Sequence, residues 1–162
     1  MTTTSRLVVR ELRYLLCAAA IGAPLWFYFA VIRPHQQHME WYRGVERRIV
    51  RLAEHQPAGL TEAQWAACIY WTWQLHGNWG PAFQEPAASR FLAEFDNRLA
   101  GEVGLGTIDW VWDEYGRHAP GGRRYSENYR PTTPESLKRV AEVPDDAYAL
   151  EPWRERLRRM GR

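Results

Sequence analysis

The chain has 162 residues, 14% of them aromatic and nine of them tryptophan, with a formal charge of +2 at pH 7. Around one apolar segment near the amino terminus, four arginines against one glutamate give +3, so residues 34–162 carry −1. A nearly neutral domain binds the phosphate backbone poorly, which argues against a nucleic-acid partner.

The most apolar stretch is residues 14–32, YLLCAAAIGAPLWFYFAVI, which holds nineteen residues without a charge. As a helix it would be roughly 28 Å long, close to the thickness of the membrane hydrocarbon. Aromatic residues cluster at its second end, where such side chains favour the headgroup boundary. We therefore predict a flank over residues 1–13 and a single transmembrane helix over 14–32, bent near Gly22 to Pro24.

A cleaved signal peptide is the competing interpretation, because small residues occupy positions 18–20. The apolar run continues past them, and Arg33-Pro34 does not resemble a cleavage site, so retention of the anchor is preferred. Three arginines precede the segment and five follow within residues 33–51. These counts conflict with the usual orientation of short-tailed anchors. We expect a single-pass protein of the cell membrane and leave the side of its soluble domain open.

Periodic apolar residues predict a juxtamembrane helix over 35–56, which ends before Pro57. A Trp-rich helical core is expected over 57–116. Its first helix begins at the capping box Thr61 to Gln64 and stops at Gly77. A second helix runs from about Pro86 to Gly101.

A third short helix is predicted from a Thr107 cap to Gly116, with a strand over TIDWVW as the alternative. Residues 117–134 are rich in turn formers and are expected to form a surface loop without a core of its own. Amphipathic helices should complete the chain over 135–162. The predicted class is all-α, with the following core residues: Trp65, Ile69, Trp73, Phe91, Phe95 and Trp112.

The passage WTWQLHGNWG is the most distinctive in the chain and suggests a ligand or partner surface. Its aromatic faces would stack on sugar rings or hold a cation, and the polar tips of His76 and Asn78 would orient the ligand. The competing interpretation is that large aromatic residues fill the core of a small domain. The candidate surface comprises Trp71, Trp73, His76, Asn78 and Trp79.

The carboxy-terminal segment WRERLRRMGR combines one apolar stripe with several arginines, a composition typical of helices on anionic lipid surfaces. The candidate lipid contacts are Arg154, Arg156, Arg158 and Arg159. The alternative is a solvated final helix that packs through Trp153 and Leu157.

Catalytic and metal-binding patterns are weak. His35 and His38 have helical spacing but no third ligand, GEVGLG lacks the phosphate-binding order, and no serine lies in a hydrolase motif, so we predict no metal or cofactor. An unfamiliar enzyme using His76 with Asp109 or Asp113 remains an alternative.

The preferred function is a noncatalytic, membrane-anchored interaction or assembly subunit. Its expected partners are membrane lipid, through residues 14–32, and another membrane or membrane-associated protein. The alternative of another class is a binding module for an aromatic-compatible ligand or polysaccharide.

Overall fold

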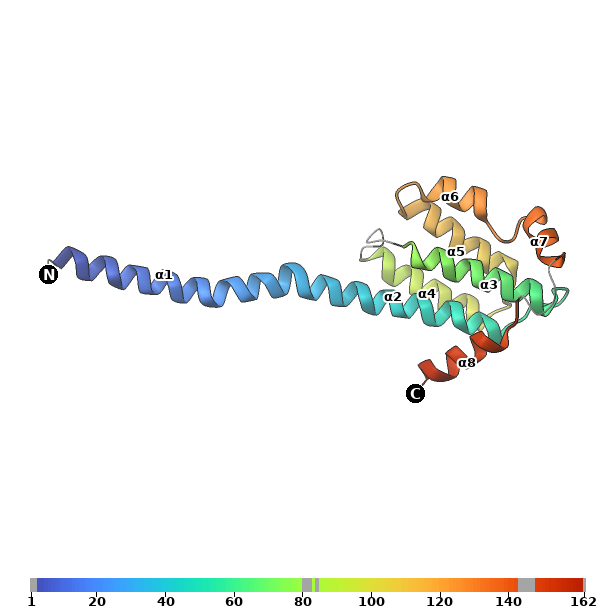
Figure 1. Cartoon of the computed structure of the whole chain (residues 1–162), viewed down its shortest axis with the longest axis horizontal. Coiled ribbons are helices and arrows are strands. Elements are labelled where there is room, and N and C mark those ends of the chain that lie inside the picture. Colours follow the sequence, from blue (N-terminus) through green and yellow to red (C-terminus); the bar gives the residue numbers. More distant parts are fainter. Residues whose placement is uncertain (1–2, 80–82, 84, 143–147, 162) are drawn as a thin grey trace. The chain divides into compact units, whose positions relative to one another are not determined.

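The structure is a computed structural model that describes residues 3–79, 83, 85–142 and 148–161, and all regular structure in these ranges is helical (Figure 1). The predicted all-α class is therefore confirmed. The chain divides into two compact units, residues 1–40 and 41–162. Parts of three predicted segments lie outside the described residues: 1–2 of the flank, 80–82 and 84 of the core, and 143–147 and 162 of the carboxy-terminal region.

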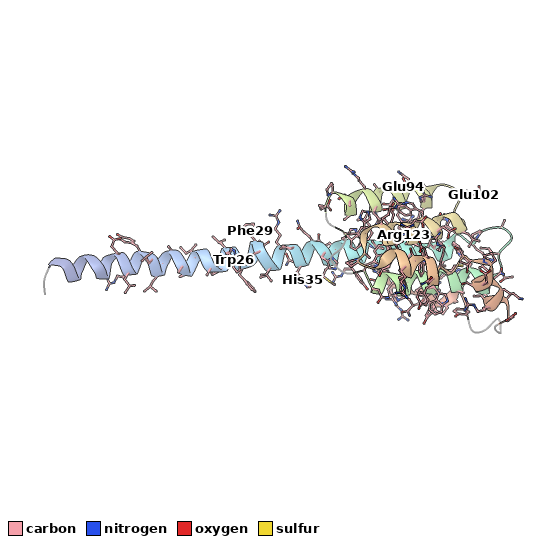
Figure 2. The ribbon with its side chains drawn as sticks, turned by 90° about the horizontal axis from the view of Figure 1, so that it is seen from above. Trp26, Phe29, His35, Glu94, Glu102 and Arg123 are labelled. Carbon is pink, nitrogen blue, oxygen red and sulfur yellow. The ribbon has the colours of Figure 1, made fainter. Side chains whose placement is uncertain are left out.

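The first unit is helical from α1 (Thr3–Phe27) through a short π-helix (Tyr28–Ile32) into the beginning of α2 (Arg33–Arg51). This helix is long and apolar enough to cross a membrane. Every side chain from residue 11 to 32 is exposed, and Figure 2 shows Trp26 and Phe29 projecting from the ribbon. α1 begins at Thr3, so it includes most of the flank predicted over residues 1–13.

Proline residues lie at two places in this helix. Pro24 lies inside α1, where the predicted bend was expected. The described departure from α-helical hydrogen bonding comes later, at Tyr28–Ile32, where the Arg33 amide donates to the Tyr28 carbonyl five residues earlier. Pro34, which has no amide hydrogen to donate, lies directly after this change of hydrogen-bond register.

In the second unit, the later part of α2 buries one apolar face through Trp41, Val45 and Ile49. A single 3-10 turn, Leu52–Glu54, ends this helical stretch before Pro57. The helix predicted over 35–56 corresponds to α2, which ends at Arg51, together with this 3-10 turn, which ends at Glu54.

Helix α3 (Glu62–Gly77) begins at the predicted capping box. The Thr61 hydroxyl accepts from the Gln64 amide at 3.2 Å, and the Gln64 side chain accepts from the Thr61 amide at 2.9 Å. Nine of its residues are buried, and it packs against α5 and α7 (Figure 1). The buried Trp65 indole donates to the Leu52 carbonyl at 2.7 Å, so its polar atom remains satisfied in the core.

Helix α4 (Ala87–Ala100) matches the predicted second helix and buries Phe91, Phe95 and Leu99 along one face. Helix α5 (Leu105–His118) replaces the strand alternative. Its predicted ends were wrong: the N-cap is Gly104 instead of Thr107, and the helix continues through Gly116. Thr107 is buried, at 4% exposure, so its side chain packs in the interior of the helix bundle.

The surface loop predicted over residues 117–134 was also wrong, because this segment contains α6 (Gly122–Tyr129) packed along α5 (Figure 1). Gly121 turns the chain with a φ of 70°, a conformation that favours glycine. A Cβ on Gly122 would lie 2.5 Å from the Tyr115 carbonyl oxygen. Glycine therefore permits close contact between the helices, and the turn-forming composition was misread as a loop.

Two further helices complete the described chain. Helix α7 (Pro134–Ala141) begins where predicted, with the Thr133 hydroxyl accepting from the Ser136 amide. Helix α8 (Glu151–Met160) contacts the 3-10 turn that follows α2.

The core of the second unit confirms most of the predicted set, since Trp65, Ile69, Phe91, Phe95 and Trp112 are all buried. Trp73 is the exception. It is half-buried at the edge of the core, because α8 covers only part of its ring.

Candidate binding pocket

A surface pocket of about 310 Å³ lies where α3, α6 and α7 meet in the second unit. Its volume is at the lower end of the range seen for small-molecule sites. Nine of the described residues line it: Trp71, Tyr125, Asn128, Tyr129, Pro131, Ser136, Arg139, Val140 and Tyr148. Four of these are aromatic.

The aromatic walls are held by ring contacts from neighbouring elements. Tyr125 stacks in parallel with the buried Trp112 of α5, with ring centroids 6.0 Å apart. Tyr129, which is also on α6, has its ring centroid 4.9 Å from that of Tyr125. Tyr70 contacts both Trp71, at 5.2 Å, and Tyr148, at 5.9 Å. The pocket therefore has walls anchored to the core.

Two of these rings are conspicuously open to solvent. Trp71 is 42% exposed and Tyr129 is 62% exposed, and they are the only large hydrophobic side chains so exposed in the described part of the second unit. Burying an aromatic side chain contributes strongly to binding at protein interfaces. The pocket thus presents apolar area that an occupant would cover.

The polar part of the lining comes mainly from α7 and its amino-terminal turn. The Ser136 hydroxyl donates to the Arg130 carbonyl at 3.2 Å and accepts from the Thr133 hydroxyl at 2.9 Å. The exposed Arg139 guanidinium reaches the Ser136 hydroxyl at 3.4 Å and the Glu135 carbonyl at 3.3 Å. It forms no ion pair with any carboxylate in the described ranges, and it is the charged residue among the described lining residues.

Of the five residues predicted as a ligand or partner surface, only Trp71 lines this pocket. His76 and Trp79 are buried, at 0% and 3% exposure, and belong to the core instead. His76 lies among the rings of Tyr42, Trp73 and Trp79, with centroid distances of 3.9, 5.8 and 5.7 Å. These two assignments were wrong, because the residues turn inward from the helix end.

Trp73 and Asn78 occupy other positions. The Arg156 guanidinium lies 4.0 Å from the centroid of the Trp73 ring, and the ring centroids of Trp153 and Trp73 are 5.9 Å apart. Trp73 therefore packs against α8. The exposed Asn78 side chain donates to the Gln74 carbonyl at 3.0 Å and so caps the end of α3. The predicted surface is therefore not assembled at one place.

The four arginines predicted as lipid contacts all have acidic partners. Arg156 pairs with Glu46 at 2.7 Å, which ties α8 to α2 within the second unit. Arg158 and Arg159 pair with Glu155 at 2.8 and 3.0 Å, and Arg154 lies 3.9 Å from Glu151. These pairs reduce the positive charge that α8 offers to an anionic surface, and the lipid contact stays a prediction.

The two carboxylates considered for catalysis, Asp109 and Asp113, both form ion pairs that connect neighbouring elements. Arg130 pairs with both Asp109, at 3.3 Å, and Asp113, and the Thr132 hydroxyl donates to Asp109. These contacts join α5 to the turn after α6. His76 is enclosed by aromatic rings, so the geometry lends no support to the enzyme alternative. Among the described residues, no group of three or more potential metal ligands lies together.

Most of the residues that line the pocket were not predicted from the sequence alone. Tyr125, Asn128 and Tyr129 lie in the segment predicted as a loop, and Arg139 and Tyr148 carried no motif. The available signal was the spacing of Tyr125 and Tyr129, which places both on one face of a helix once the segment is read as helical. Comparisons with protein-family models, curated proteins and solved structures found no match.

Proposed function

We propose that this protein is a noncatalytic, membrane-anchored interaction subunit that binds a segment of a partner protein in the pocket around Trp71. The observation that carries the proposal is the exposure of Trp71 and Tyr129 in a pocket whose walls are packed on the core. Prearranged aromatic walls lose little conformational entropy on binding, which favours recognition of an extended partner segment.

The anchor in this proposal is the apolar helix over residues 14–32, which places the second unit at the surface of the cell membrane. Its support is the uncharged length, the exposure of every side chain along it, and the aromatic residues at its second end. Lipid covers this surface most simply, since exposed apolar area of that extent is unfavourable in water.

The interaction role is tested by purifying the full chain from membranes in mild detergent. The Trp71→Ala/Tyr129→Ala double variant should lose its partner, whereas Trp26→Ala removes an exposed indole outside the second unit and serves as the control. Quantitative mass spectrometry should show at least about tenfold depletion of the same protein from the double variant alone.

A photoreactive phenylalanine at position 129 then reports direct contact. The proposal expects it to form an adduct with the protein that the double variant loses. Equal recovery of every co-purified protein with the double variant, or isolation of the chain alone, would refute the interaction role.

The second candidate function, binding of a small or polysaccharide ligand, is favoured by the same volume and by the stacking faces of Trp71 and Tyr129. The two candidate functions differ in the molecule expected in the pocket, which is a small ligand or polysaccharide here and a protein segment in the interaction role. Equilibrium dialysis of the purified chain against oligosaccharides distinguishes the two functions, because the interaction role requires no sugar affinity.

A further inference from the structure

The hydrogen-bonding groups in the pocket favour one kind of occupant. The Trp71 indole, the Asn128 amide and the hydroxyls of Tyr129 and Tyr148 make no hydrogen bond to any described residue, although each can donate. None of the nine lining residues is acidic. The pocket therefore offers several hydrogen-bond donors beside its aromatic faces, and its described lining contains no carboxylate.

This balance matches the backbone of a proline-rich segment. Prolines have no amide hydrogen, and in the extended polyproline conformation their carbonyls face outward and accept hydrogen bonds. Aromatic grooves recognise such segments because the prolyl rings pack on their faces. Sugar hydroxyls need acceptors as well as donors, and the described lining offers for this only neutral amide and hydroxyl oxygens, without a carboxylate.

The charge of the lining refines the inference. Arg139 is the one charged residue among the nine, and it has no carboxylate partner within the part of the chain that the structure describes. A positive group in the occupant would be repelled, which disfavours quaternary ammonium ligands despite the four rings. A carboxylate would gain a charge-assisted hydrogen bond with the guanidinium.

We propose that the pocket formed by Trp71, Tyr125, Tyr129, Tyr148 and Arg139 binds a proline-rich, acidic segment of the partner protein in an extended conformation. This inference rests on the proposed interaction function and adds the chemistry of the bound segment. The prolyl rings pack against the aromatic walls, the outward carbonyls accept from the indole and amide, and an acidic side chain pairs with Arg139.

The test uses the full chain in lipid nanodiscs and fluorescence anisotropy of a short labelled peptide with a repeating Pro-Pro-Glu composition. Trp71→Ala should weaken binding about thirtyfold, as expected for an aromatic residue at the centre of an interface. Arg139→Glu should weaken it about tenfold by reversing the charge of the lining. Trp26→Ala and Arg124→Glu are the matched controls, since both side chains are exposed and lie outside the pocket.

Comparison peptides separate the components of the inference. Replacing each glutamate by lysine should weaken binding to the wild type by a similar factor and restore it in Arg139→Glu, and replacing each proline by alanine should weaken binding throughout. Equal affinity for the glutamate and lysine peptides, or stronger affinity for a chitooligosaccharide that depends on Trp71, would overturn the inference.

The outcome also remains distinct from that of the proposed function. If no proline peptide binds while the position-129 adduct persists, the segment chemistry is wrong and the interaction role stands. If the adduct is absent as well, both fail.

Discussion

At the residue scale, the buried Thr72 of α3 is satisfied by one bond within its helix and one from α5. The Thr72 hydroxyl donates to the Cys68 carbonyl at 2.7 Å and accepts from the Trp112 indole at 3.3 Å. These bonds allow a hydroxyl and an indole to lie in the interior without an unpaired donor. Cys68 lies beside them with 1% exposure and serves as a small apolar residue.

The environment of Cys68 predicts an unreactive thiol. Burial raises its pKa to about 12, and the charge of Asp109 acts in the same direction. At pH 8 only about one molecule in ten thousand would carry the reactive thiolate, because each pKa unit changes the ratio tenfold. In a Cys17→Ser background, iodoacetamide should leave Cys68 unmodified until the chain is unfolded in guanidinium. Rapid modification of the folded chain would contradict this prediction.

The raised pKa of Cys68 also predicts how the stability of the folded chain changes at alkaline pH. A folded thiol with a pKa of about 12 and an unfolded one near 9 means that the unfolded chain releases its proton first. The contribution of the Cys68 thiol to the free energy of unfolding is fully present below about pH 9 and is lost as the pH rises towards 12.

At the element scale, the contact between α5 and α6 depends on glycine. A Cβ at Gly122 would lie 2.5 Å from the Tyr115 carbonyl oxygen and 2.9 Å from the Ala119 Cβ, while one at Gly116 would lie 2.6 Å from the Ser126 hydroxyl oxygen. This contact holds Tyr125 against Trp112, so it also positions one wall of the pocket.

We therefore expect Gly122→Ala to lower the free energy of unfolding by about 1–3 kcal/mol, the usual cost of overpacking. Gly106→Ala is the control. Its Cβ would meet nothing within 4 Å, so the unfolding free energy should stay unchanged or rise by up to about 1 kcal/mol. Urea unfolding of the full chain in detergent, followed by circular dichroism, measures both. An equal effect of the two substitutions would show that the close contact is unimportant.

At the scale of the whole molecule, the proposed membrane anchor can be tested separately from the pocket. Ile21 lies near the middle of residues 14–32 and is 66% exposed. Placing arginine there should cost about 2.5–3.5 kcal/mol of insertion free energy.

Ile21→Arg should therefore shift the chain from the membrane pellet to the alkaline carbonate supernatant, whereas Gln36→Arg, outside the apolar run, should not. Mass spectrometry of the wild type in the pellet should recover residues 14–32. A mature chain lacking these residues would instead identify a signal peptide.

Features that depend on neighbours a few residues apart could be predicted from the amino-acid sequence. The α3 capping box joins Thr61 to Gln64, and the apolar face of α4 repeats at helical spacing, so both follow from short-range sequence patterns. The uncharged run of residues 14–32 was equally clear, since its length and composition need no tertiary partner.

Which aromatic residues form the core and which stay exposed depends on the packing of the helices and could not be predicted from the sequence. His76 and Trp79 turn inward among other rings, while Trp71, from the same passage, faces the pocket. Helix α6 was missed because its Gly-rich start resembles a turn, although Gly122 is required for close packing on α5. The pocket unites residues as far apart as Trp71 and Tyr148. Its geometry follows from contacts between helices, which local spacing does not encode.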